Sequence, residues 1–130
     1  MTQAAHLRDG ALAEKIAARH LRESGLKLIE SNFRCRSGEL DLILASPERL
    51  VVAEVRYRRS RSYGGPLATV TAAKQQRIVR ATQLFLQAKP EYRSLPVRFD
   101  VVAVSGSLDS DPGAPDIEWI QGAFSAGAPF

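Results

Sequence analysis

Apolar positions along the chain follow two periods, one helical and one of strands. They recur near helical spacing between Asp9 and Gly25, which predicts an amphipathic helix with a cap at each end. The same spacing predicts a second helix from Thr71 to Lys89, which Pro90 stops. Apolar runs or polar-apolar alternation predict strands over residues 26–33, 38–44, 50–58, 97–105 and 117–120. The nearly continuous apolar run of 97–105 favours a strand inside the sheet.

These elements follow one another in the order αβββαβ(β), which is typical of a small mixed sheet flanked by helices. At 130 residues and 45% hydrophobic content, the chain is long enough for one core and too short for two. We therefore expect a single α/β domain over residues 1–130, with frayed tails at 1–8 and 125–130.

The second and third expected strands form a hairpin around the turn residues Ser46 to Arg49. Continued from that turn, the register places Asp41 opposite Glu54, and Glu39 opposite Arg56. Directly opposed side chains have Cβ atoms about 4.5–5.5 Å apart, and like charges at that distance repel.

Two carboxylates in this arrangement have two interpretations. A hard cation, Mg²⁺ or Mn²⁺, takes oxygen ligands, so Asp41 and Glu54 would share one ion, with the carbonyl of Val55 as a third ligand. Alternatively, the strand lies at an edge, both carboxylates are solvated, and Arg56 and Arg36 neutralise them. A register shifted by one residue would separate the pair and favour the second interpretation.

The formal net charge of +4 conceals a strong asymmetry along the chain. Residues 1–48 are neutral overall, residues 49–98 carry +9, and residues 99–130 carry −5. A basic block of this kind is the usual feature of a polyanion-binding surface.

The beginning of the chain has no apolar run of the kind that a signal peptide needs, and no later stretch approaches the length of a membrane span. The single cysteine, Cys35, agrees with a reducing compartment. We expect a cytoplasmic protein that has no membrane partner.

The segments NFRCRSGELDLI, AEVRYRRS, YGGP, RFDVVAV and IEWI, together with Lys74-Gln75 at a helix start, resemble the YraN-type family of uncharacterised bacterial proteins. The resemblance covers about Asp9 to Phe124. That family is in turn similar to the PD-(D/E)XK nuclease superfamily, and within it to Holliday-junction resolvases.

The resemblance implies a restriction-endonuclease-like core in which Asp41 and Glu54 fill the metal-binding acidic positions. It implies that Glu14 is an additional glutamate near the metal, and that Lys74 or Gln75 is a polar residue of the following helix. Arg56 occupies the place of the motif lysine. Arginine binds phosphate well, but its pKa above about 12 excludes it as a general base. A metal-bound hydroxide would supply a nucleophile without any lysine.

The cations of the basic block are candidates for contacts to a nucleic-acid backbone. The alternative is a solvated surface, and strand alternation places Tyr57 on the face opposite Arg56. We expect nucleic acid as the partner; the resemblance implies DNA, although the residues themselves do not distinguish DNA from RNA. The candidate binding residues are Arg36, Arg58, Arg59, Arg61, Lys74, Arg77 and Arg80.

Three functions remain open at this stage. The first is a metal-dependent endonuclease that hydrolyses phosphodiesters in branched or structured nucleic acid, with Asp41, Glu54 and Arg56 as catalytic residues. The second is a binding module of the same fold that has little or no activity. The third is an adaptor whose acidic C-terminal third contacts a basic partner. By analogy with resolvases a homodimer is a further expectation, which no residue of the chain demonstrates.

Overall fold

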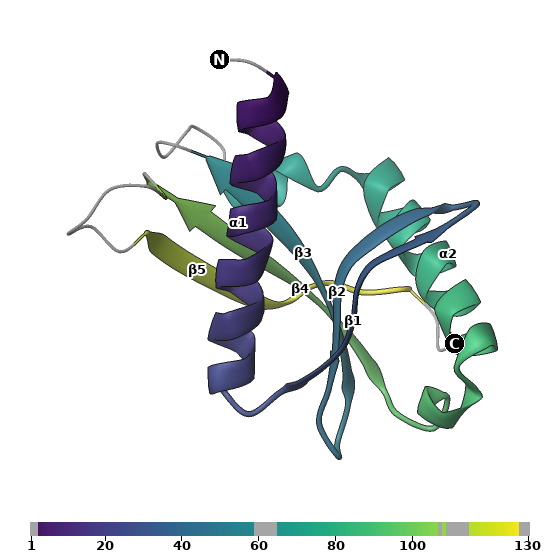
Figure 1. Cartoon of the computed structure of the whole chain (residues 1–130). Coiled ribbons are helices and arrows are strands. Elements are labelled where there is room, and N and C mark those ends of the chain that lie inside the picture. Colours follow the sequence, from purple (N-terminus) through teal and green to yellow (C-terminus); the bar gives the residue numbers. More distant parts are fainter. Residues whose placement is uncertain (1–2, 59–64, 107, 109–114, 128–130) are drawn as a thin grey trace.

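Five strands form one mixed sheet whose order follows the chain, β1-β2-β3-β4-β5 (Figure 1). The structure is a computed structural model that describes residues 3–58, 65–106, 108 and 115–127. All neighbouring strands are antiparallel except β3 and β4, which are parallel. The strands are β1 (Lys27–Cys35), β2 (Gly38–Ala45), β3 (Leu50–Arg58), β4 (Val97–Ser105) and β5 (Asp116–Phe124).

A helical crossover joins the two parallel strands, as parallel pairing requires. It contains the short 3-10 helix η1 (Pro66–Thr69), helix α2 (Ala72–Ala88) and a second 3-10 turn, η2 (Pro90–Tyr92). The Thr71 side chain caps α2 by accepting a hydrogen bond from the Lys74 amide, and the helix ends before Pro90. The predicted bounds of this helix are confirmed.

The helices cover opposite faces of the sheet (Figure 1). Small residues of α1 (Gln3–Glu23), among them Ala13 and Ala17, pack on β2, β3 and β4. On the other face, Ile78 and Phe85 of α2 pack against residues of the same three strands, such as Leu50 and Phe99. The expected mixed α/β architecture, with β4 inside the sheet between β3 and β5, is confirmed.

Two predicted boundaries are wrong. The last strand, β5, runs over Asp116–Phe124 rather than 117–120. Helix α1 begins at Gln3 rather than at an Asp9 cap, and Asp9 lies within the helix, 6% exposed. Ala4 and Ala5 have high helix propensity, and the single Gly10 does not interrupt the helix. In the described part of the chain, neither helix combines the length and apolarity that crossing a membrane would require.

Candidate active site

Strands β2 and β3 pair as the sequence predicts for only part of their length. The ladder runs from Ala45↔Leu50 to Leu42↔Ala53 and stops there. The predicted ladder pairs Asp41–Glu54 and Glu39–Arg56 are therefore wrong. Both strands are internal to the sheet, so the interpretation that places the carboxylates on a solvated edge is also excluded.

The ladder stops because β2 changes face at Asp41. Leu40 packs in the core beneath α2, whereas Leu42 packs in the core beneath α1, although residues two apart on a regular strand share a face. Pairing between β1 and β2 continues on both sides of Asp41, at Ser31↔Leu42 and Phe33↔Leu40. On the neighbouring strand β1, the residue between these pairs is Asn32, whose backbone is left-handed with a φ of 55°.

Side-chain hydrogen bonds bring the two predicted carboxylates together across this gap. Asp41 Oδ2 accepts from the Val55 amide at 2.9 Å, and the Asp41 amide donates to Glu54 Oε2 at 3.4 Å. The side chain of Asp41 is 18% exposed and that of Glu54 is 7% exposed. The two acids thus meet where β2 separates from β3, through side chain to main chain contacts.

The guanidinium of Arg56 spans both carboxylates. Its Nη1 lies 3.9 Å from Asp41 Oδ2, and its Nη2 lies 3.8 Å from Glu54 Oε1. Nη1 also donates to the Val55 carbonyl at 3.1 Å, and Nε donates to Thr69 Oγ1 at 3.0 Å. Arg56 therefore contacts both predicted acidic ligands and the predicted carbonyl ligand, while η1 holds the other side of its side chain.

A cleft of about 460 Å³ opens beside this pair, between α1 and the splayed strands. Glu14 of α1 lines it together with Asp41 and Arg56, so the structure brings Glu14 to the predicted site. Asn32 and Glu39 line it as well. With its amide nitrogen facing the carboxylates, Asn32 donates to Glu14 Oε1 at 3.1 Å and to Glu39 Oε1 at 2.8 Å.

Burial raises the pKa of all three acids that the sequence predicts as ligands. The pKa of Glu54 is raised to about 8, first by burial and then by the Asp41 charge. Burial raises the pKa of Asp41 against the opposing effects of the Val55 hydrogen bond and Arg56. The pKa of Glu14 is raised by burial and by Asp41. Burial thus outweighs the effect of Arg56 on Asp41 and Glu54 and favours the protonated, neutral form of these acids.

The donor set fits a hard divalent cation in its chemistry. Carboxylate and carbonyl oxygens are the ligands that Mg²⁺ and Mn²⁺ prefer, and a cation would favour the charged form of these buried acids, whose pKa values are raised. Within residues 3–58, 65–106, 108 and 115–127, no group of three or more His, Cys, Asp or Glu side chains is arranged as a metal centre. Arg56 also contacts the predicted ligand oxygens, so a cation would need the guanidinium to move.

The predicted nucleic-acid-binding residues are spread around the site rather than gathered at one point. Lys74 Nζ donates to the carbonyl of Thr69, the residue that holds Arg56. Arg77 lies against the β1–β2 hairpin at Gly38. A side chain added to Gly38 would place its Cβ 3.9 Å from the Cβ of Arg77. Arg36 is exposed in the turn of that hairpin.

The remaining predicted cations differ in their positions. Arg58 ends β3 and lines a hollow of about 210 Å³ with Arg56, Asp116 and Glu118. Arg80 lines another hollow with Ser125 to Gly127. Arg59 and Arg61 lie outside the described residues. The Tyr57 hydroxyl donates to the Gly106 carbonyl at 2.8 Å, and its side chain packs beneath α1, on the face predicted for it.

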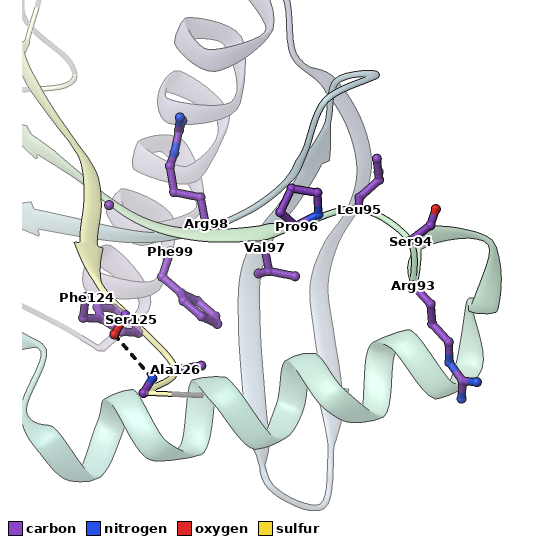
Figure 2. Close-up of a pocket in the computed structure, with 12 residues that line it drawn as sticks. Arg93, Ser94, Leu95, Pro96, Val97, Arg98, Phe99, Phe124, Ser125 and Ala126 are labelled. Carbon is purple, nitrogen blue, oxygen red and sulfur yellow. Dashed lines mark hydrogen bonds between the residues drawn. The ribbon is translucent and has the colours of Figure 1, made fainter. Parts of the chain in front are cut away.

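Two other features serve the fold. Asp100, fully buried, accepts hydrogen bonds from Arg98, from Trp119 Nε1 at 2.9 Å and from the Gly122 amide at 3.0 Å, so it ties β4 to β5. A hollow of about 900 Å³ lies between the segment before β4 and the residues after β5 (Figure 2). None of the predicted site residues that the structure describes lines it.

Sequence reasoning missed Asn32 and Thr69 and did not place Glu39 in the site. Asparagine is one of the few residues that adopt a left-handed conformation readily, but nothing in the sequence marks residue 32 as such a position. Thr69 follows Pro66 in a segment without hydrophobic periodicity. Its contact with Arg56 arises from the path of the crossover in three dimensions, which the sequence pattern does not indicate.

The fold and the cleft define a small α/β protein with a buried acidic pair beside an arginine. Residues 13–104 match Uncharacterised protein family UPF0102, and the chain belongs to that family. A UPF0102 protein of Stutzerimonas stutzeri is 48% identical over 119 residues, 91% of this chain and 95% of the relative. One of Pseudomonas aeruginosa is 43% identical over 127 residues, 97% of this chain and 100% of the relative. One of Alcanivorax borkumensis is 48% identical over 115 residues, 88% and 90% of the two chains.

Proposed function

We propose that this protein is a metal-dependent endonuclease-like protein that hydrolyses phosphodiester bonds in branched or structured nucleic acid. The observation that carries the proposal is the buried pair Asp41 and Glu54, which meets beside Arg56. Of these residues, Asp41 and Arg56 line a cleft that opens to solvent. A buried acidic pair with raised pKa values is costly, and such arrangements concentrate at functional sites.

The proposed ligands are Asp41, Glu54 and the Val55 carbonyl, with Glu14 at the opposite wall of the cleft. Mg²⁺ or Mn²⁺, when bound, would activate water and stabilise the charge of the transition state. Glu54 must lose its proton before it can act as a ligand, and a cation favours that loss. Arg56, once its guanidinium turns from the carboxylates, would hold a phosphate oxygen by charge-assisted hydrogen bonds.

The resemblance to the PD-(D/E)XK superfamily supports this assignment. A mixed sheet covered by a helix on each face agrees with the restriction-endonuclease-like core that the resemblance implies. Asp41 on β2 and Glu54 on β3 lie on the elements where that resemblance expects the acidic positions.

The proposed partner is nucleic acid, and DNA is the first candidate. Exposed cations stand on two parts of the fold, Arg36 in the turn between β1 and β2 and Lys74 and Arg77 on α2. A phosphate backbone can bind such a scattered set, because each cation neutralises one phosphate independently.

Arg56 favours a second candidate function, a nucleic-acid-binding module without catalysis. Its guanidinium already lies across the proposed ligand oxygens, and arginine cannot serve as a general base. In this case the buried carboxylates would hold Arg56 in place rather than a metal.

Cleavage assays separate the two candidates. The purified protein is incubated with duplex, single-stranded, flap and four-way-junction DNA, and with matching RNA, in Mn²⁺, Mg²⁺ or EDTA. Asp41→Ala and Glu54→Ala are assayed beside the wild type, and Glu48→Ala, which changes an exposed turn residue, is the matched control.

Metal-dependent cleavage that both site variants lose by at least about 100-fold, and that Glu48→Ala retains, would support the nuclease. Cleavage that persists in both site variants would indicate a contaminating nuclease and contradict the proposal. Binding without cleavage in every metal would favour the binding module.

A further inference from the structure

We infer that Asn32 is the positioning residue of the acidic cleft: its left-handed backbone, opposite Asp41, sets the change of face that turns Asp41 toward Glu54, and its amide holds Glu14 beside Glu39. The inference deepens the proposed function, because it assigns a residue that organises the same site. It rests on two independent observations, one of the backbone and one of the side chain.

The backbone observation is the left-handed conformation of Asn32. With φ at 55°, it is the only residue other than glycine with a positive φ in the described part of the chain. An L-residue pays roughly 1–2 kcal/mol for this region, and asparagine tolerates it better than most. The conformation coincides with the change of face at Asp41, since the pairs Ser31↔Leu42 and Phe33↔Leu40 lie on either side of both residues.

This change of face gives Asp41 its place in the site. Without a change of face, β2 would continue its ladder with β3 beyond Leu42↔Ala53. The Val55 amide would then pair with main-chain oxygen instead of donating to Asp41 Oδ2. The change of face thereby re-aims the side chain of Asp41, which is a proposed ligand.

The side-chain observation is the pair of hydrogen bonds from the Asn32 amide. One goes to Glu14 on helix α1 and the other to Glu39 on strand β2, at 3.1 Å and 2.8 Å. A neutral amide can hold two carboxylates together without cancelling their charge. A lysine at this position would neutralise them, and an aspartate would repel them.

Packing alone does not explain this strained residue. Asn32 is exposed and belongs to neither core cluster, so apolar burial does not offset the free-energy cost of its left-handed conformation. Both of its partners line the cleft that contains Asp41 and Arg56. What it stabilises is the arrangement of carboxylates in that cleft.

Two substitutions separate the backbone role from the amide role. Asn32→Gly retains the left-handed conformation and removes both donors, whereas Asn32→Ala removes the donors and strains the backbone. Ser31→Gly is the matched control, because it places glycine at the neighbouring exposed position. A double-mutant cycle combines Asn32→Gly with Glu39→Ala.

We expect Asn32→Ala to lower the urea midpoint of unfolding further than Asn32→Gly does. In the cycle, the shifts of Asn32→Gly and Glu39→Ala should be non-additive, because each removes the same hydrogen bond. In calorimetry, Asn32→Gly should weaken Mn²⁺ binding about 10-fold, as the loss of a residue that orients ligands does. Ser31→Gly should leave Mn²⁺ binding unchanged. If glycine weakened Mn²⁺ binding only by loosening this strand, Ser31→Gly would weaken it as well.

Additive shifts in the cycle, or equal midpoints for the glycine and alanine variants, would overturn the inference. Unchanged Mn²⁺ binding in Asn32→Gly would overturn its link to the site. A wild-type protein that binds no Mn²⁺ would instead contradict the proposed metal, and the cycle would still decide whether Asn32 positions the carboxylates. The two proposals therefore fail in different measurements.

Discussion

At the scale of single residues, the cleft depends on charge that is only partly balanced. Glu54 lies among apolar residues of β3 and is 5% exposed, close to Asp41 and within 3.8 Å of Arg56. Arg56 lowers the pKa of both acids, but burial outweighs it, and both values are raised. A protein that kept Glu54 for stability alone would do better with a neutral side chain there.

Substitution of Glu54 by glutamine should therefore stabilise the protein at alkaline pH. The folded protein keeps a proton on Glu54 up to about pH 8, whereas the unfolded chain releases it near the ordinary value of 4.5. Stability of the wild type consequently falls as the pH rises between these values. We expect Glu54→Gln to be more stable than wild type by about 1–3 kcal/mol at pH 8 and little different at pH 4.

Urea unfolding of both proteins between pH 4 and pH 9 measures this difference. Glu48→Gln, at an exposed turn position, controls for the loss of one charge. If wild type and Glu54→Gln show the same dependence of stability on pH, Glu54 does not carry the raised pKa that the burial implies.

At the scale of elements, hydrophobic periodicity predicts most of the fold, because the burial of apolar side chains determines which segments form helices and strands. Helix α2, its Thr71 cap and the Ser46–Arg49 turn follow from local patterns. The register near that turn is also predictable, since the length of a hairpin turn fixes the pairing of the residues beside it.

The arrangement of the site could be predicted only in part from the sequence. The alternation of β2 places Asp41 and Glu54 near each other, but it assumes a regular ladder. The break at Asp41 depends on a left-handed Asn32 one strand away, and the position of Arg56 depends on Thr69 in the crossover. Both features depend on how two separate segments of the chain lie beside each other, and the sequence pattern within each segment does not indicate that.

A buried polar cluster joins the last two strands and gives an element-scale prediction. Asp100 pairs with Arg98 through two hydrogen bonds of 2.8 and 2.9 Å and also accepts from β5. Replacement by alanine leaves these donors without their acceptor. We expect Asp100→Ala to lose about 3–5 kcal/mol of unfolding free energy, and Asp100→Asn to lose less.

Fluorescence of Trp119, the only tryptophan of the chain, reports on this cluster directly. Unfolding curves of both Asp100 variants are compared with wild type and with Glu91→Ala, which changes an exposed residue of η2. A loss below about 1 kcal/mol in Asp100→Ala would mean that the cluster does not hold β4 to β5.

At the scale of the whole molecule, the basic and acidic thirds of the sequence meet. Asp116 and Glu118 of β5 line the same hollow as Arg56 and Arg58, so part of the negative C-terminal third lies against the basic block of its own chain. The cations of helix α2 in the crossover, Lys74 and Arg77, are exposed. These cations are the ones on which binding of a polyanion should depend.

Binding of DNA should therefore weaken steeply with salt, because each phosphate contact releases condensed counterions. For four or five contacts the slope of log K against log salt concentration is about −4 for duplex DNA. Lys74→Ala and Arg77→Ala should each reduce the slope by about 1 and weaken binding of different sequences equally.

Lys27→Ala is the matched control, because it removes one charge at the end of β1 opposite the hairpin turn. Fluorescence anisotropy between 50 and 300 mM salt, values chosen to span the physiological range, measures the slopes. An affinity that does not change with salt, or a slope that Lys27→Ala reduces as much as Arg77→Ala, would show that these cations are not a phosphate-binding surface.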